Sequence, residues 1–152
     1  MKIDGYSLLA TVDCSQKPSQ IEKSLRESGY TFGLGAIDNE LPLKSYLHGE
    51  ALLDAHLAVA DLAWLCAAMK IRLPDGSEQR TVETPRSAAG PDLRFLLLGG
   101  RGKAGEIEEV DLRIRTLPEK TAAATFIAHD LETAIATLRS RVQNFNVPAW
   151  VR

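Results

Sequence analysis

The chain has 152 residues, of which 45% are hydrophobic and 25% are charged, and this composition suits one soluble domain of ordinary size. Its formal charge of −2 excludes a dedicated nucleic-acid binder, because such proteins neutralise phosphates with clustered Lys and Arg. No apolar run reaches the roughly 18 residues of a membrane span, no signal peptide is recognisable, and Cys14 and Cys66 stand outside any CxxC pair. We therefore expect a cytoplasmic protein with reduced thiols that binds neither membranes nor nucleic acid.

The first part of the chain alternates strand-like and helix-like segments. Residues 6–14 carry β-forming side chains and predict a strand. A helix should follow, with Pro18 in its first turn, Ile21 and Leu25 on its buried face and Gly29 at its C-terminal end. Further along, the residue types favour a short strand at 30–35, a loop at 36–46 and an alanine- and leucine-rich helix at 50–62.

A hairpin is predicted in the middle of the chain. Its strands should cover residues 66–73 and 77–84, because the sequence Pro-Asp-Gly at 74–76 is a turn signal. A loop at 85–90 and a short helix at 91–98 should follow, the helix buried on most sides by Phe95 to Leu98.

The clearest strand covers residues 106–115, where apolar and charged side chains alternate. Val110, Leu112 and Ile114 should face the core, and Asp111, Arg113 and Arg115 should face water. A strand with one buried face and one solvent-exposed face favours an antiparallel sheet. The remainder predicts a strand at 124–128, a helix at 131–142 capped by Asp130 with Ile135 and Leu138 on its core face, and a last strand at 147–151. The pattern as a whole is α+β: an antiparallel sheet flanked by helices.

Four glycines, Gly99, Gly100, Gly102 and Gly105, form the most distinctive motif. Glycines let backbone N–H groups turn toward an anion, but the spacing is that of neither a P-loop nor a dinucleotide fingerprint, and a plain connector is favoured. His48, Glu50, Asp54 and His56 are the only cluster with metal-ligand chemistry, and their spacing does not predict a metal. No catalytic motif is present. Trp64 and Trp150 are expected to be core or interface anchors.

The order of several motifs resembles one family, the FAD-linked oxidases of the vanillyl-alcohol oxidase and p-cresol methylhydroxylase type, which includes glycolate oxidase subunits. The motifs are Pro74-Asp75-Gly76, Gly90-Pro91-Asp92-Leu93, the run Gly99 to Ile107 and Leu117-Pro118. The resemblance implies that residues 1–118 correspond to the second subdomain of the family's FAD-binding domain. Residues 119–152 would then be a remnant of the start of the cap, or substrate, domain.

The same resemblance implies which residues would touch FAD. These are Gly99, Gly100, Gly102, Gly105, Ile107 and Gly49. The family's flavin diphosphate rests on a T-x-G-G turn, and the corresponding place here is Glu40-Leu41-Pro42-Leu43, so Pro42 and Leu43 replace the glycine pair. Proline has no N–H and leucine adds bulk, so we predict that this chain by itself does not hold FAD.

Three hypotheses about function follow. The first is a degenerate, non-catalytic relative of the FAD-linked oxidases that works by binding a protein or a ligand. The second is an FAD-binding accessory subunit whose other half is a separate chain. The third is a small hydrolase or metal enzyme that uses His48, Asp54 and His56. We also expect a homodimer, or a partner protein that covers the sheet, since a partial fold exposes apolar surface; the last strand could pair across chains.

Overall fold

The computed structural model describes residues 1–33, 40–51, 61–81, 92–120, 122, 125 and 127–144. The chain divides into two compact units, Met1–Leu117 and Pro118–Arg152, and each is described by itself. Some predicted features lie outside the described residues: most of the helix at 50–62, the loop at 85–90, the strand at 147–151, Asp54, His56 and Trp150.

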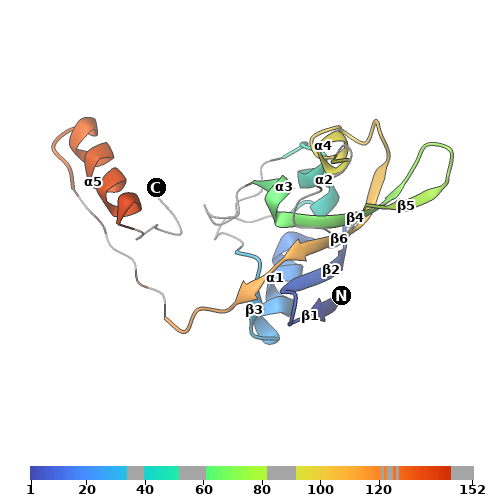
Figure 1. The fold of residues 1–152 in the computed structure, drawn as a ribbon, viewed down its shortest axis with the longest axis horizontal. Helices are drawn as coiled ribbons and strands as arrows, with labels where there is room; N and C mark the ends of the chain where they lie inside the picture. The colour runs from blue at the N-terminus through green and yellow to red at the C-terminus, as the bar shows by residue number, and fades with distance from the viewer. Residues whose placement is uncertain are drawn as a thin grey trace. The chain divides into compact units, whose positions relative to one another are not determined.

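The first unit is built on a five-stranded antiparallel sheet with the strand order β1-β2-β6-β4-β5 (Figure 1). The strands are β1 Lys2–Asp4, β2 Leu9–Asp13, β4 Cys66–Arg72, β5 Glu78–Arg80 and β6 Glu106–Arg113. A two-stranded antiparallel sheet joins β3 Tyr30–Thr31 to β7 Arg115–Thr116. The predicted α+β class with an antiparallel sheet is confirmed.

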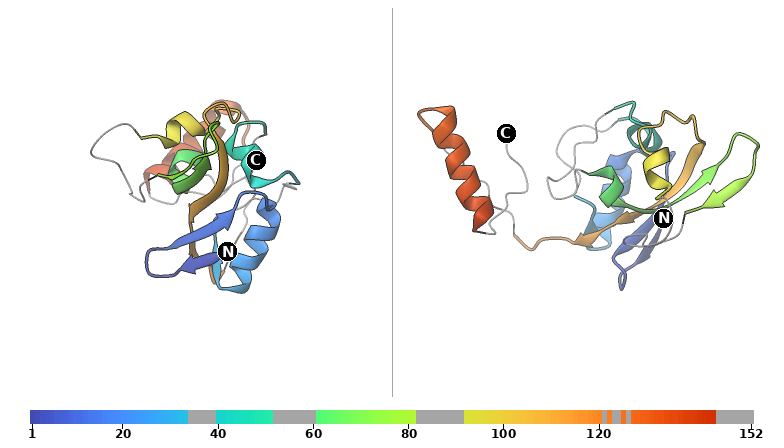
Figure 2. Two further views of the ribbon diagram at one scale, coloured as in Figure 1. Left: turned by 90° about the vertical axis from the view of Figure 1, so that its right-hand side faces the viewer. Right: turned by 45° about the horizontal axis from the view of Figure 1, so that its top comes forward.

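Short helices accompany the sheet. They are α1 Pro18–Glu27, α2 Leu43–Leu47, α3 Leu62–Leu65 and α4 Arg94–Leu97, and the second unit contains α5 Leu131–Gln143. Figure 2 shows α1 alongside the β1–β2 hairpin, while α3 and α4 accompany β4. Helix α1 forms as predicted, since Pro18 begins it, Ile21 and Leu25 are buried on one face, and Gly29 follows its end with φ +81°.

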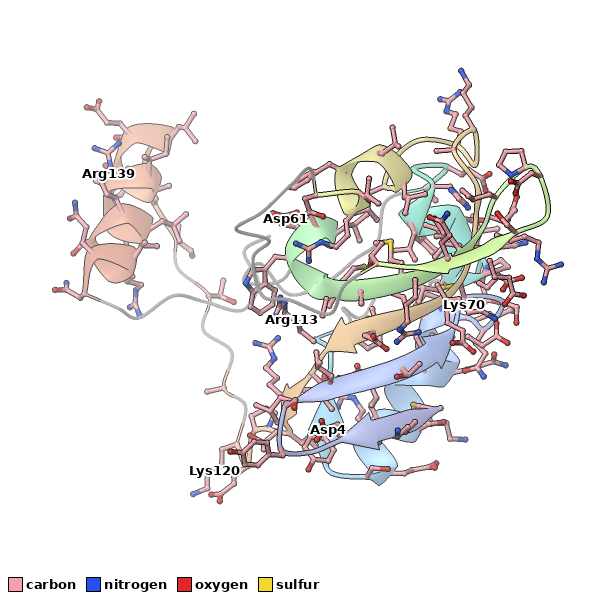
Figure 3. All side chains as sticks on the ribbon, turned by 45° about the vertical axis from the view of Figure 1, so that its right-hand side comes forward. Asp4, Asp61, Lys70, Arg113, Lys120 and Arg139 are labelled. Atoms are coloured by element: carbon pink, nitrogen blue, oxygen red, sulfur yellow. The ribbon has the colours of Figure 1, made fainter. Side chains whose placement is uncertain are left out.

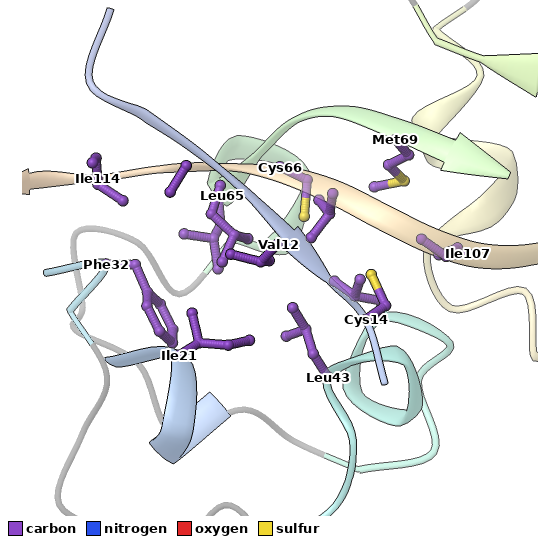
Figure 4. Packing of buried hydrophobic residues seen from close by; sticks show 14 of the residues in the cluster. Val12, Cys14, Ile21, Phe32, Leu43, Leu65, Cys66, Met69, Ile107 and Ile114 are labelled. Atoms are coloured by element: carbon purple, nitrogen blue, oxygen red, sulfur yellow. The ribbon is translucent and has the colours of Figure 1, made fainter. Parts of the chain in front are cut away.

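The core lies on one face of the sheet, between β2, β6, β4 and the helices (Figure 4). Val12, Val110 and Met69 are side by side in register on three adjacent strands, and all three are buried. Ile21 of α1 and Leu43 of α2 close over them. Each fully buried side chain of this size contributes roughly 1.5–3 kcal/mol of hydrophobic free energy, so β6 is the centre of the unit's stability.

The other face of the sheet carries charged side chains in cross-strand pairs, among them Lys70, which is labelled in Figure 3. Lys70 pairs with Glu78 at 2.7 Å and with Glu108 at 3.4 Å. Asp111 was expected in water, but it is only 2% exposed: Thr11 Oγ1 donates to it at 2.7 Å and Arg80 pairs with it. Two partners compensate this buried carboxylate, as a buried charge requires.

Several predicted elements differ in the structure. Strand β2 begins only at Leu9, because the Asp4 carboxylate accepts from the N–H groups of Tyr6 and Ser7 and forms the turn of a β1–β2 hairpin. Helix α2, Leu43–Leu47, begins inside the predicted loop at 36–46. Helix α4 is not buried on most sides, since Phe95 is 69% and Leu96 63% exposed.

The position of Trp64 and the structure of the second unit also differ from what the sequence predicts. The Trp64 side chain is half-exposed under the Arg113 guanidinium, 5.5 Å from the ring centroid, so it is not a core anchor. Asp130 caps α5 as expected, its side chain accepting from Thr133 N at 2.7 Å. No side chain of α5 is buried, Ile135 and Leu138 included, and the described residues 125, 127 and 128 are not in a strand.

Candidate functional site

The glycine loop, residues 99–105, connects α4 to β6 as the sequence predicted, following a helix and opening a strand. Its backbone turns through the left-handed region at Gly99, Arg101, Gly102 and Gly105, with φ values of +72°, +50°, +70° and +147°. A Cβ on Gly105 would lie 2.8 Å from the carbonyl oxygen of Arg72. The glycines are therefore required by the path of the loop and by its close contact with β4.

Gly49 lies beside this loop although fifty residues separate it from Gly99. A Cβ on Gly49, which has φ +78°, would lie 3.0 Å from Gly99 Cα. The Gly99 N–H donates to the Leu47 carbonyl at 2.8 Å, so the end of α2 and the start of the loop are joined. The structure thus brings together two of the positions that the family resemblance singled out.

His48 accepts two further hydrogen bonds from the glycine loop. The N–H of Arg101 donates to the His48 carbonyl at 3.1 Å, and the N–H of Gly102 donates to His48 Nδ1 at 3.0 Å. The imidazole is buried, with a side-chain exposure of 5%. In the sequence, His48 stood out only for its metal-ligand chemistry, at a spacing that does not predict a metal. Its contact with Gly102 joins distant segments and has no signal in the local sequence.

The backbone donors of the glycine loop are used inside the chain. Gly100 N–H donates to Leu97 O at 3.2 Å, Lys103 N–H to Gly100 O at 3.1 Å and Gly105 N–H to Gly102 O at 3.2 Å. Together with the bonds from Gly99, Arg101 and Gly102, these leave no row of N–H groups aimed at an anion. The prediction that the loop is a connector agrees with this geometry.

The turn at 40–43 is also occupied by internal contacts. Pro42 is the N-cap of α2, and Leu43 is fully buried in the core. The N–H groups that follow the turn are taken: Leu43 N donates to Gln16 O at 2.8 Å and Lys44 N to Cys14 O at 2.9 Å. Leu41 N donates to Tyr46 Oη at 3.3 Å. The backbone donors of this turn are therefore used within the chain.

A pocket of about 520 Å³ opens between the end of β2, the start of α2 and the first residues of β6. It is lined by Asp13, Ser15, Lys44, Arg72, Glu106, Ile107, Glu108 and Glu109. Four of these side chains are carboxylates and two are cations. Lys44 Nζ lies 3.8 Å from Glu106 Oε2, and Arg72 pairs with Glu108. Hydrogen bonds from Ser15 lower the pKa of Asp13. The pocket is thus negatively charged at neutral pH.

Ile107, the predicted FAD contact on β6, faces the core with its side chain 1% exposed. It is opposite Ile71 in the β4–β6 ladder and lines the pocket next to Glu106 and Glu108. The structure therefore brings Ile107 and Lys44, the neighbour of Leu43, to one pocket.

The two cysteines are free and buried. Burial raises the pKa of the Cys66 thiol to about 12 and raises that of Cys14 further. Neither sulfur is a nucleophile at neutral pH, because the thiolate is the reactive form.

Within the described parts of the chain, no three His, Cys, Asp or Glu side chains gather where they could hold a metal ion. Among the helices described there, none combines the length and apolar character that crossing a bilayer demands.

Comparison with known proteins places these features in a family. The chain is 30% identical over 147 residues to an uncharacterized FAD-linked oxidoreductase, YgcU, of Escherichia coli K12, covering 91% of this chain and 29% of that protein. It is 23% identical over 151 residues, 99% of this chain, to alkyldihydroxyacetonephosphate synthase of Caenorhabditis elegans, of which it covers 25%. It is 35% identical over 81 residues to a mitochondrial D-lactate dehydrogenase (cytochrome) of Arabidopsis thaliana, covering 50% of this chain and 14% of that protein.

A solved alkyldihydroxyacetonephosphate synthase has the same fold over 79% of this chain and 21% of its own, with a TM-score of 0.66 and 20% identity. No family model matches the sequence. The chain spans less than a third of the length of each of these relatives. The sequence and fold comparisons agree with the resemblance drawn from the motifs, and the chain belongs to the FAD-linked oxidoreductase family.

Proposed function

We propose that this chain is a non-catalytic member of its family that does not hold FAD by itself and acts by binding a protein or a ligand. The observation that carries the proposal is the turn at 40–43. Pro42 lacks an N–H, and those of Leu41, Leu43 and Lys44 donate within the chain.

The charge of the neighbouring pocket supports the same conclusion. Glu106 and Glu108 flank Ile107, and Asp13 and Glu109 add two further carboxylates. A pyrophosphate placed there would meet like charges at short range, which costs free energy even when solvent screens part of the repulsion. Lys44 and Arg72, the two cations, are already paired with carboxylates of the pocket.

Titration with FAD tests the proposal. We expect purified protein to be colourless, and calorimetry, flavin fluorescence and thermal unfolding to show no response to FAD. A ligand present at 100 times its Kd would stabilise the fold by about 2.7 kcal/mol, a clear rise in Tm. Pro42→Gly, which restores one N–H and leaves Leu43 in the core, is the matched variant. Yellow protein, or a saturable rise in Tm with FAD, would contradict the proposal.

An FAD-binding accessory subunit is the second candidate. It is supported by the 30% identity to an FAD-linked relative, and in this candidate a separate chain provides the other parts of a flavin site. In this case FAD would bind only to a mixture of the two chains. A flavin signal that appears when a candidate partner is added, and is absent for either chain alone, distinguishes this function from the first.

We propose a homodimer as the form in which the chain works, with a cytoplasmic location that its free thiols favour. Exposed apolar side chains on α3 and α4 support association: Trp64, Leu93, Phe95 and Leu96. Sedimentation velocity over a hundredfold concentration range should show a dimer. Phe95→Glu should dissociate it and Tyr6→Glu, at an exposed site elsewhere, should not. A monomer at every concentration would count against the homodimer.

A further inference from the structure

The imidazole of His48 has a defined tautomer. Its Nδ1 accepts the N–H of Gly102 at 3.0 Å, and a nitrogen that accepts a hydrogen bond carries no proton. The neutral ring therefore has its hydrogen on Nε2. The His48 side chain is only 5% exposed, so water has little access to the ring and the Gly102 bond is the main polar contact of Nδ1.

The opposite nitrogen is left without a partner. Among the described residues, His48 Nε2 is the buried side-chain polar atom that lacks a hydrogen bond. The nearest carboxylate oxygen, Glu106 Oε2, lies 3.9 Å away, too far for a hydrogen bond but close enough for an ion pair. Glu106 is 60% exposed at its side chain and can move toward a charged ring.

Protonation of the ring would reverse the polarity of Nδ1. A proton there would face the Gly102 N–H, so two donors would oppose each other and the bond would be lost. Backbone hydrogen bonds from Gly99 and Arg101 also hold the loop, but the Nδ1 bond is the side-chain contact that fixes Gly102. It lies next to Arg101, which takes a left-handed backbone at φ +50° without being glycine. Such a conformation persists only when surrounding contacts enforce it.

We propose that His48 is a pH-sensitive latch: its neutral imidazole holds Gly102 of the glycine loop, and its protonated form releases Gly102. Release would loosen the segment that leads into Glu106 and so open one wall of the pocket. The charged groups on the elements around the ring are Lys44 of α2, Glu50 just after that helix, Glu106 of β6, and Arg101 and Lys103 of the loop. The latch does not depend on whether FAD binds.

Nuclear magnetic resonance of the full chain tests the latch directly. Long-range ¹H–¹⁵N spectra at pH 8 should show the Nε2–H tautomer for His48. As the pH is lowered from 8 to 5, the Gly102 amide signal should shift with the same midpoint as the signals of the His48 ring. The amides of residues 100–105 should then lose protection from hydrogen exchange.

Three variants sharpen the test. His48→Asn keeps an acceptor near the place of Nδ1 that cannot titrate, so the Gly102 amide should remain in place from pH 8 to pH 5. Glu106→Gln removes the anion that pairs with a charged ring and should lower the midpoint, while Lys44→Gln removes a nearby cation and should raise it. A Gly102 amide that ignores titration of His48, an Nδ1–H tautomer, or a ring that stays neutral until the protein unfolds would overturn the latch.

Discussion

Arg94 shows at the scale of one residue how a charged side chain can be built into the interior. It is 7% exposed, and its guanidinium donates to the carbonyls of Cys66 at 2.7 Å and Ala63 at 3.3 Å. Asp92 pairs with it at 2.6 Å. One side chain of α4 therefore satisfies the carbonyls at the junction of α3 and β4, where the helix ends and the strand begins.

Arg94→Met should lower the free energy of unfolding by about 2–4 kcal/mol, because it leaves buried carbonyls and Asp92 without their partner. Urea unfolding measures the change. Lys23→Met, an exposed site on α1, is the control and should change stability by less than about 0.5 kcal/mol. An equal effect of both substitutions would show that the hydrogen bonds of Arg94 do not stabilise the fold.

The pair should also give a defined pH dependence. Hydrogen bonding to Arg94 lowers the pKa of Asp92 below its ordinary range. A carboxyl with a lowered folded-state pKa stabilises the protein above its unfolded pKa, and this contribution is lost as the pH falls through the folded value. The stability difference between wild type and Asp92→Asn should therefore be largest near neutral pH and shrink below about pH 4. A difference that is constant from pH 7 to pH 3 would refute the assignment.

At the scale of elements, the sequence predicts helices that depend on neighbouring residues and misses helices that depend on long-range contacts. Helix α1 could be predicted because its start, its buried face and its end are written in neighbouring residues: Pro18, Ile21, Leu25 and Gly29. Helix α2 could not, since its residues read as a loop and it forms where Leu43 and Leu47 enter the core. Helices this short gain their stability from packing rather than from propensity.

Substitution of two glycines distinguishes two effects on the free energy of unfolding: the strain of a left-handed backbone and a steric clash of the added Cβ. Gly76, with φ +84°, has no atom within 4 Å of an added Cβ, whereas Gly105 has Arg72 O at 2.8 Å. Gly76→Ala should cost about 1 kcal/mol for the left-handed backbone alone. Gly105→Ala should cost at least about 1 kcal/mol more, because the loop must move away from β4. Chemical denaturation of both variants checks this prediction. Equal losses of unfolding free energy would mean that the loop can move away from β4 without a measurable cost.

At the scale of the whole molecule, the buried core belongs to the first unit and is centred on β6. Leu112 of β6 is fully buried between Ala10 and Cys66. Leu131 of α5 is 75% exposed. Hydrophobic stabilisation depends on the area removed from water, so the two leucines should differ greatly.

Leu112→Ala should lower the free energy of unfolding by about 2–5 kcal/mol, the range for a buried leucine that leaves a cavity. Leu131→Ala, the same change at an exposed site, should alter it by less than about 0.5 kcal/mol. Hydrogen exchange should show the slowest amides in β6 and its neighbours. Comparable losses for both variants would mean that the stability of the fold does not rest on the sheet.

The sequence by itself determined the α+β class, the strands near 66–72 and 106–113, the helix α1 and, through the order of its motifs, the family. These features depend on residues close together in the chain, whose periodicity and turn chemistry act locally. Only the tertiary structure decided what the glycine loop does. Three of its donors, the N–H groups of Gly99, Arg101 and Gly102, are satisfied by Leu47 and His48, some fifty residues earlier, and the turn at Pro42 is hydrogen-bonded to the residues that follow β2. Hydrogen bonds between distant segments leave no periodic trace in the sequence, so whether an N–H is free for a ligand can be read only from the folded chain.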